Sequence, residues 1–421
     1  MVNTTEELRV PVRARVRSFN YLVYLIIFMG LVAVMDQYLS MIKMTAIPYI
    51  IEEYGITASA FSGYEALYLA ATFLIFLLNG LNDIIGRKYS ILILILMMGL
   101  SSLGIVLFTP SFHLFMVFYT IVMFTTVSNM WSIPISEESP ATKRSKYVAI
   151  VYVIGLLPFQ ALLPQFLMNT LGLSWKWMYG VMFVFMLPLL IMWQFMKETH
   201  RYTIIKKERQ QGTRKYHLFG AGVINRSDLR YIAIAASVWL VWLIYSFLKD
   251  WAGYYFMTIH GYTLMEWQVT QLVFLIMAMI GGVGSGVIME RIGRKPAFIG
   301  GSVALALALV LMGVSRGILL PVAAAITGFF TSFTYTWIVV YIPEVFPTER
   351  RGACMGWTTT AARFSYVIGP ALASVLLKAF PTMQLFWVAA AGVALLPIII
   401  ILLFNPYETK TKELEDIEVM R

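Results

Sequence analysis

Asp83-Ile-Ile-Gly-Arg-Lys88 recurs as Glu290-Arg-Ile-Gly-Arg-Lys295, so a short charged motif appears twice with a separation of 207 residues. A second pair of motifs keeps the same separation: Glu137-Glu-Ser-Pro-Ala-Thr-Lys-Arg144 and Glu344-Val-Phe-Pro-Thr-Glu-Arg-Arg351. Two unrelated motifs rarely share one separation by chance. The chain is therefore predicted to consist of two copies of one unit, each about half of its length.

The composition between these motifs is that of a membrane protein. Only 13% of the 421 residues are charged, 59% are hydrophobic and the mean hydropathy is +0.76, whereas soluble proteins carry about 25% charged residues. Apolar runs of about 20 residues are long enough to cross a bilayer as helices, and they lack the alternation of barrel strands. Twelve such runs are predicted, at residues 19–45, 60–80, 89–109, 112–134, 147–169, 175–196, 230–256, 267–290, 296–315, 318–341, 353–379 and 383–404.

The predicted fold is an all-α membrane protein with twelve transmembrane helices in two pseudo-symmetric six-helix bundles. We expect residues 1–196 to form the N-terminal bundle and residues 230–421 to form the C-terminal bundle with a short tail. Between them, the polar and basic residues 197–229 are expected to form a linker at the membrane surface. The first helix follows a basic segment without a small-residue cleavage site, so it is read as a retained span.

Lysine and arginine residues predict the orientation of the chain. Of the 32 basic residues, 26 fall in the N-terminal segment, the linker, the tail and the loops on the same side. Basic residues favour the cytoplasmic side of a membrane, so both termini are expected to be cytoplasmic, and we expect a multi-pass protein of the plasma membrane. This distribution also accounts for most of the net charge of +10 without a nucleic-acid partner.

Several other functions lack support in the sequence. The single cysteine, Cys354, excludes a disulfide within the chain and is expected to be inert. The four histidines are scattered, no acid or nucleophile cluster suits catalysis, and no nucleotide-binding loop is present. The chain is therefore expected not to be an enzyme and to need no cofactor or metal. Its expected partners are a small-molecule solute, protons and the lipid bilayer, and it is expected to work as a monomer.

The motif at residues 83–88 resembles the signature loop between helices 2 and 3 of the major facilitator superfamily. Its second copy is more complete, because Gly286 stands four residues before Glu290. The Glu-x-x-Pro-x-x-x-Arg motifs that begin at Glu137 and Glu344 resemble the sugar-porter and organic-ion-transporter branch. The resemblance implies a transporter that rocks one half against the other around a site in the membrane midplane.

A third motif supports the same branch. Tyr407-Glu408-Thr409-Lys410 after the last helix is similar to the Pro-Glu-Thr-Lys ending of that branch, and Met196-Lys-Glu198-Thr199 is its counterpart in the first half. The resemblance also implies that acidic and basic residues at the cytoplasmic helix ends form an ion-pair ring, a latch that holds this side closed. The residues predicted for this latch are Asp83, Arg87, Glu137, Arg144, Glu290, Arg294, Glu344 and Arg351.

Six ionisable residues stand out inside predicted spans, where an ionisable residue at mid-bilayer costs about 2.5–3.5 kcal/mol on insertion scales and so needs a role. They are Asp36, Lys43, Glu65, Lys249, Asp250 and Arg363. At 1.5 Å per residue, Asp36 lies roughly 25 Å along helix 1 and Arg363 roughly 15 Å into helix 11. Both depths are near the centre of the membrane.

Lys43 has two candidate partners. Glu65 is predicted at a similar depth on the next helix, and Asp250 occupies the place of Lys43 in the second half, 207 residues later. Lys43 and Asp250 are predicted to form an extracellular gate. The alternative for Lys249 and Asp250 is that they reach the membrane surface with their polar ends.

Asp36 is predicted to carry the coupled proton, with Glu65 as a second candidate, because a low-dielectric cavity favours the protonated carboxyl. The sequence around Asp36 resembles helix 1 of metabolite–proton symporters; a direct solute contact and a structural charge are the alternatives. Arg363, in a segment that resembles helix 11 of organic-anion carriers, is predicted to bind a carboxylate, or else to pair with Asp36. Further predicted wall residues of the solute site are Asn129, Gln160, Gln165, Trp242, Tyr245, Gln271, Tyr335 and Trp337.

The function expected from these residues is proton-coupled symport of a small organic metabolite by alternating access, with an organic anion favoured by Arg363. A sugar or polyol carrier is the first alternative, because the branch motifs allow it. An organic-cation carrier that uses Asp36 or Glu65 is the second. A nutrient sensor that keeps the transporter fold without transport is an alternative from a different class.

Overall fold

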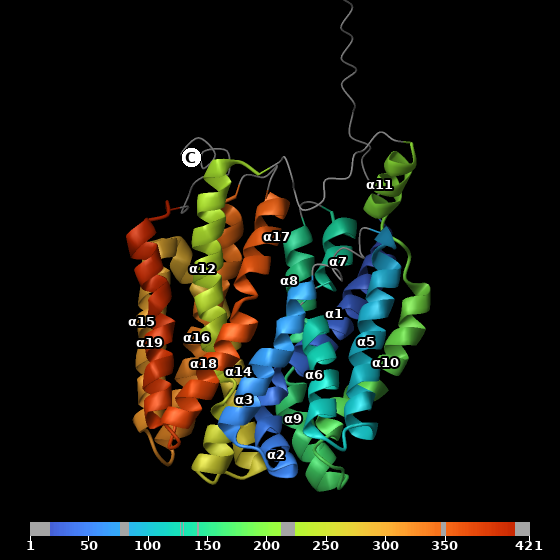
Figure 1. The fold of residues 1–421 in the computed structure, drawn as a ribbon. Helices are drawn as coiled ribbons and strands as arrows, with labels where there is room; N and C mark the ends of the chain where they lie inside the picture. The colour runs from blue at the N-terminus through green and yellow to red at the C-terminus, as the bar shows by residue number, and fades with distance from the viewer. Residues whose placement is uncertain are drawn as a thin grey trace, which may run out of the picture.

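The computed structural model describes residues 17–75, 84–126, 128, 130–140, 143–211, 224–346 and 351–408. The described residues form helices and turns, arranged as two bundles that stand side by side (Figure 1). The first half contains α1 (Phe19–Met41), α2 (Lys43–Tyr54), α3 (Ala58–Leu69), the 3-10 helix η1 (Ala70–Leu74), α5 (Arg87–Leu107), α6 (Phe112–Thr126), α7 (Ser132–Glu138), α8 (Arg144–Gly155), α9 (Phe159–Gln165), the π-helix η2 (Phe166–Thr170) and α10 (Trp177–Phe195).

A short helix in the predicted linker, α11 (His200–Gln210), follows the first half. The second half contains α12 (Arg226–Lys249), α13 (Ala252–Tyr254), the π-helix η4 (Tyr255–Ile259), α14 (Leu264–Ile292), α15 (Arg294–Val314), α16 (Leu319–Glu344), α17 (Arg351–Ala362), α18 (Ser365–Ala379) and α19 (Gln384–Phe404). Helix α12 begins four residues before the predicted domain boundary at residue 230, and an Asn225–Asp228 capping box fixes its start.

The predicted set of twelve spans is confirmed. Among the described residues, ten helices are long and apolar enough to cross a membrane, and α6 is a shorter apolar helix. The remaining span begins with α3 and η1 and runs toward residues 76–83, which lie outside the described residues. Helix α6 falls short because the fourth span is interrupted after Thr126 and resumes as α7.

Several spans are broken helices where the sequence predicts single ones. The first span breaks at Ile42, the seventh between α12 and α13, and the eleventh at Arg363 and Phe364. Lys43 begins α2, Asp250 is the C-cap residue of α12, and Arg363 lies in the third break. Irregular backbone at membrane depth is tolerated where it is buried in protein or lines a cavity. The breaks therefore mark the interior where the charged residues are placed.

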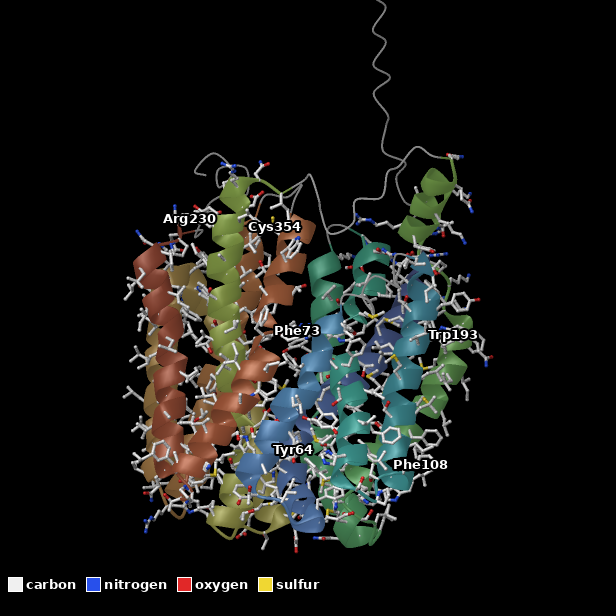
Figure 2. All side chains as sticks on the ribbon, viewed as in Figure 1. Tyr64, Phe73, Phe108, Trp193, Arg230 and Cys354 are labelled. Carbon is white, nitrogen blue, oxygen red and sulfur yellow. The ribbon has the colours of Figure 1, made fainter. Side chains whose placement is uncertain are left out.

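The outer surface of the bundle is apolar, as a protein that faces lipid requires. Side chains project outward along the whole length of the helices, from Arg230 and Trp193 to Tyr64 and Phe108 (Figure 2). Val283 is 74% exposed although it lies in the middle of a predicted span. Such a surface would be unfavourable in water, because large exposed apolar patches are rare on soluble proteins.

The two ends of the bundle differ in what they carry. Helix α11, the start of α12 and the end of α19 lie at one end, which we call the terminal face, and α2 and η4 lie at the other, which we call the opposite face (Figure 1). Within the halves, α5 packs on α10 and α14 on α16. Between the halves, α3 packs on α18, and α2 packs on α13 near the opposite face.

Candidate functional site

A cavity of about 280 Å³ lies between the two halves, in the middle of the bundle. Both halves contribute to its wall, with α1 and α8 on one side and α12, α14, α16 and α18 on the other. Small-molecule sites in proteins are typically about 300–1,000 Å³, so the cavity suits a small solute. Its aromatic and uncharged polar lining residues include Gln37, Ser40, Thr126, Tyr152, Trp242, Ser246, Phe247, Thr331, Ser332, Tyr335 and Tyr366.

The charged side chains that line this cavity are Lys249 and Asp250, at the end of α12. The Lys249 ammonium lies 2.9 Å from Oδ1 of Asp250. The other oxygen of Asp250, Oδ2, lies 3.0 Å from the ammonium of Lys43. Asp250 therefore bridges a lysine of each half, and these two residues face the interior rather than the membrane surface.

Lys43 also forms an ion pair with Glu65. Both predicted partners of Lys43, Glu65 and Asp250, therefore contact it at the same time. Its ammonium lies 2.9 Å from Oε1 of Glu65, and each of the two side chains is only 1% exposed. The same Glu65 oxygen accepts a hydrogen bond of 2.7 Å from the Tyr119 hydroxyl. Lys43, Glu65, Lys249 and Asp250, which we call the buried charge network, carry two positive and two negative charges.

Further contacts join the halves between this network and the opposite face. The Trp267 indole donates to the Thr45 hydroxyl at 3.0 Å, and Ser59 donates to the carbonyl of Ser374 at 2.9 Å. At Gly253, a side-chain carbon would overlap with the backbone oxygen of Met44. The two halves are therefore packed tightly on this side of the cavity. The predicted gate pair Lys43–Asp250 belongs to this closed region, while its role in gating stays a prediction.

Asp36 lies behind the cavity wall, next to the lining residue Gln37. It is fully buried, and its Oδ2 accepts hydrogen bonds from Nε2 of Gln37 at 3.0 Å and from the Trp131 indole at 3.3 Å. Its other oxygen, Oδ1, has no hydrogen-bond partner among the described residues. The lone pairs of Oδ1 therefore leave room for a proton on this carboxyl.

Arg363 is placed near Asp36 by the break between α17 and α18. Its guanidinium lies over the ring of Tyr366, 5.4 Å from the ring centre, and interacts electrostatically with Asp36. Tyr366 in turn lines the cavity. Arg363 thus lies close to the cavity, behind the aromatic wall at Tyr366. It also lies near Asp36, its predicted alternative partner.

The other predicted wall residues divide into two groups. Trp242 and Tyr335 line the cavity and pack against each other with ring centres 4.9 Å apart. Tyr245 is buried and shares a hydrogen bond with Thr331, a residue of the cavity wall. Of these three aromatic residues, Trp242 and Tyr335 therefore line the cavity and Tyr245 contacts its wall.

The remaining predicted wall residues lie elsewhere. Trp337 is packed inside the second half, with its ring centre 4.1 Å from that of Phe298. Gln271 is buried and accepts a hydrogen bond from Thr45, and Gln160 donates to the sulfur of Met41. The backbone N–H of Gln165 donates to the side chain of Gln268 in the other half, and Asn129 lies outside the described residues.

At the terminal face, each half contains one ion pair of the predicted latch. Arg87 lies 2.8 Å from Glu137, and Arg294 lies 3.2 Å from Glu344. Each pair joins the start of one helix to the end of another within a single half, because both partners come from the same bundle. The described pairs thus fasten helices inside each half, and a latch between the halves stays a prediction.

The rest of the predicted latch is less completely described. Glu290 is exposed at the end of α14. Arg144 and Arg351 begin α8 and α17, but their side chains lie outside the described part of the chain, as does Asp83 altogether. Cys354 is buried near the terminal end of α17 (Figure 2), while the expectation of an inert thiol stays a prediction.

At the same face, each half has a glutamate that caps the start of a helix. Glu198 accepts hydrogen bonds from the backbone N–H groups of Arg87 and Lys88, at the start of α5. Glu408 does the same for Arg294 and Lys295, at the start of α15. Carboxylates stabilise helix N-termini because they meet unsatisfied N–H groups and the positive end of the helix dipole. The two similar motifs after the sixth and twelfth spans are therefore equivalent in structure.

Comparisons with known proteins agree with this architecture. The inward open conformation of the xylose transporter XylE from E. coli aligns with a TM-score of 0.73 and 17% identity, covering 95% of this chain and all of that one. The human organic anion transporter MFSD10 (TETRAN) aligns with a TM-score of 0.60 and 14% identity, covering 91% of this chain and all of that one. At these identities, the likeness concerns the fold.

Sequence comparisons extend the agreement to the family. A probable metabolite transport protein, CsbC of Bacillus subtilis (strain 168), is 31% identical over 145 residues, which is 31% of this chain and only 30% of that relative's length. The family model of the Major Facilitator Superfamily matches residues 26–289 and 268–419, which is nearly the whole chain. With its twelve spans in two similar halves around a central cavity, the chain belongs to the major facilitator superfamily of membrane transporters of small solutes.

Proposed function

We propose that this chain is a secondary active transporter that carries a small organic anion together with a proton by alternating access. The observation that carries the proposal is the charge balance of the buried interior. Three cationic side chains, Lys43, Lys249 and Arg363, face three acidic ones, Asp36, Glu65 and Asp250. With all six ionised, the interior is neutral.

This balance couples a proton to an anion. When Asp36 binds a proton, the interior gains one positive charge, and a monocarboxylate in the cavity restores neutrality. Either ligand alone would leave an uncompensated charge in a low-dielectric region, which costs several kcal/mol. Proton and carboxylate are therefore expected to bind together and to leave together.

Asp36 is the proposed proton site because its carboxyl has an oxygen available for a proton. Among the described residues, its hydrogen bonds come from an amide and an indole, and one carboxyl oxygen has no partner. Glu65, the second candidate, accepts from Lys43 and Tyr119, so its negative charge is well compensated. We therefore assign Glu65 to the buried charge network and Asp36 to proton binding.

We further propose that the terminal face is cytoplasmic and that the protein works as a monomer in the plasma membrane, in two bundles at residues 1–196 and 230–421 with a linker between them. Helix α11 at this face carries Lys206 and Lys207, in keeping with the basic residues expected on that side. With this orientation we propose an inward-facing state, since the halves are packed together toward the opposite face.

A sugar or polyol is the second candidate solute. One solved structure with the same fold is a D-xylose-proton symporter, and the cavity offers an amide and hydroxyls at Gln37, Ser40, Ser332 and Thr331. Such groups hydrogen-bond neutral polyols well. The anion is favoured because Lys249 lines the same wall, where a neutral solute would leave its charge without a new partner.

The test is uptake into proteoliposomes with an imposed pH gradient, using a panel of small carboxylates beside sugars and amines. We expect carboxylates to accumulate only with the gradient. Asp36→Asn is expected to abolish accumulation while it retains exchange of internal for external solute, because exchange needs no net proton movement. Glu52→Gln, at an exposed position, is the control. Gradient-driven accumulation that persists in Asp36→Asn would refute the role of Asp36, and uptake of sugars alone would refute the anion.

A further inference from the structure

We infer that Lys249 receives the carboxylate of the solute and that Asp250 is an internal carboxylate that the solute displaces from it. The inference rests on the proposed function and names the group in the cavity that would recognise the anion. The first observation is the position of the charged side chains relative to the cavity. Lys249 and Asp250 line the cavity, whereas Arg363 reaches it behind Tyr366.

The ammonium of Lys249 is incompletely satisfied compared with that of Lys43. An ammonium group has three donors. Lys43 meets two carboxylates, at 2.9 and 3.0 Å, and the face of Phe247. Lys249 meets one carboxylate oxygen, at 2.9 Å, and the Met44 sulfur at 3.8 Å, and a thioether is a weak acceptor. Lys249 is therefore the lysine that has room for a further carboxylate.

Asp250 occupies the place that a solute carboxylate would take. It gives one oxygen to Lys249 and the other to Lys43. If a solute carboxylate binds Lys249, Asp250 can keep its contact with Lys43, so neither partner is left unpaired. The exchange replaces one ion pair with a similar one, which avoids the large cost of exposing a single buried charge.

The surroundings of Lys249 define the class of solute. Phe247 and Tyr366 pack against each other with ring centres 4.9 Å apart, and Trp242 lies on the same helix as Lys249. All three line the cavity. A small monocarboxylate with an apolar or planar body would place its charge at Lys249 and its body against these rings.

The same exchange links the solute to the contact between the halves. Asp250 belongs to the second half and Lys43 to the first, and their ion pair lies on the closed side of the cavity. When a solute takes Lys249, the charge of Asp250 is shared with fewer cations. The Lys43–Asp250 contact should then strengthen, so an occupied site would stabilise the inward-facing arrangement.

The experiment measures binding of a benzoate panel to the purified protein by thermal stabilisation, with the matching benzamides as neutral counterparts. Lys249→Met should weaken benzoate binding about tenfold to a hundredfold, the usual value of a charged hydrogen bond. Asp250→Asn should strengthen it about threefold or more, because the internal competitor is removed. The two variants should therefore change benzoate affinity in opposite directions. If the ion pair were merely structural, both substitutions would weaken benzoate binding. Lys378→Met, at an exposed lysine of α18, is the control.

Each outcome decides a different question. Equal benzoate binding in wild type and Lys249→Met would overturn the inference and leave the proposed function standing. Weaker binding in both variants would also overturn it. If no carboxylate stabilises the wild type, both the inference and the proposed anion fail. Because Asp250→Asn removes a buried charge, Asp250→Glu provides a folded alternative, in which the competitor remains and benzoate binding should stay within about threefold of wild type.

Discussion

The charged clusters at the terminal face and the charged residues in the membrane follow different rules. At the terminal face, Arg87 and Glu137 have close counterparts in Arg294 and Glu344, each 207 residues later. Within the membrane, Lys43 and its counterpart Asp250 have opposite charges and bind each other. The duplicated clusters fasten each half internally, while the interior uses the difference between the halves to connect them.

Asp36 and Arg363 carry this asymmetry further. The corresponding positions 207 residues away are Leu243 and Leu156. A rocking mechanism needs two rigid halves, which symmetric clusters can supply, and a site that differs between its two walls, which only asymmetric residues can supply. The following variants test whether stability and solute chemistry separate in this way.

The largest effect is expected from Lys43→Met. The substitution leaves Glu65 and Asp250 buried without their shared cation, and breaking a buried ion pair costs about 3–5 kcal/mol. We expect the free energy of unfolding, measured by denaturant titration in mixed micelles, to fall by about this amount. Lys176→Met is the matched control, because its partner Glu53 is 38% exposed and surface pairs contribute only about 0–1 kcal/mol.

A loss below about 1 kcal/mol for Lys43→Met would show that water enters the network and screens it. The buried charge network would then contribute no more to stability than a surface ion pair. The double variant Lys43→Met with Glu65→Gln refines the result, because it removes one of the two stranded charges. It should be more stable than Lys43→Met alone.

The second effect concerns the two glycines of the repeated motif. Gly86 has φ +98° and Gly293 has φ +107°, a region that is nearly restricted to glycine and costs other residues about 1–3 kcal/mol. A side-chain carbon at Gly86 would overlap with the Glu198 carboxylate, whereas at Gly293 it would stay 3.2 Å from Glu408. Both alanine variants should be destabilised, and Gly86→Ala by about 1 kcal/mol more, since it also displaces the cap.

The measurement is the free energy of unfolding of both alanine variants in the same micelles. Combining each alanine variant with removal of its cap provides the control. In Glu198→Ala, which removes the overlapping carboxylate, the further loss caused by Gly86→Ala should shrink toward the value at Gly293. Equal losses for Gly86→Ala and Gly293→Ala in the wild-type background would contradict the tighter packing of the first half.

Much of this organisation could be predicted from the sequence because it depends on spacing. The 207-residue separation pairs Lys43 with Asp250, and helix depth pairs Lys43 with Glu65. The structure has both contacts at once, since a lysine at a helix break can reach two neighbouring helices. The twelve spans follow equally well from apolar run length, which the membrane itself dictates.

Contacts that depend on local backbone breaks could not be predicted in this way. Trp131 reaches Asp36 because α6 ends at Thr126 and α7 starts only at Ser132, and no periodicity indicates that interruption. Trp337 is predicted at the cavity but packs against Phe298 instead, because the apolar residues of α16 show little helical periodicity and packing sets the rotation of the helix. The interior position of Lys249 is likewise fixed by the end of α12.

The smallest effect is expected at the two caps, Glu198 and Glu408. Each accepts the first two N–H groups of a helix at distances between 2.9 and 3.3 Å, and Glu198 also accepts from the backbone of Thr199. A charge at a helix N-terminus contributes about 0.3–1 kcal/mol. Glu198→Gln and Glu408→Gln should therefore each lower the free energy of unfolding by about 1 kcal/mol or less. Because Glu198 also accepts from Arg17 through its carbonyl, which glutamine keeps, the two losses should agree within about 0.5 kcal/mol. A clearly larger loss at Glu198 would mean that the first half depends on its terminal face more than the second, and that the symmetry of these clusters is one of sequence rather than of energy.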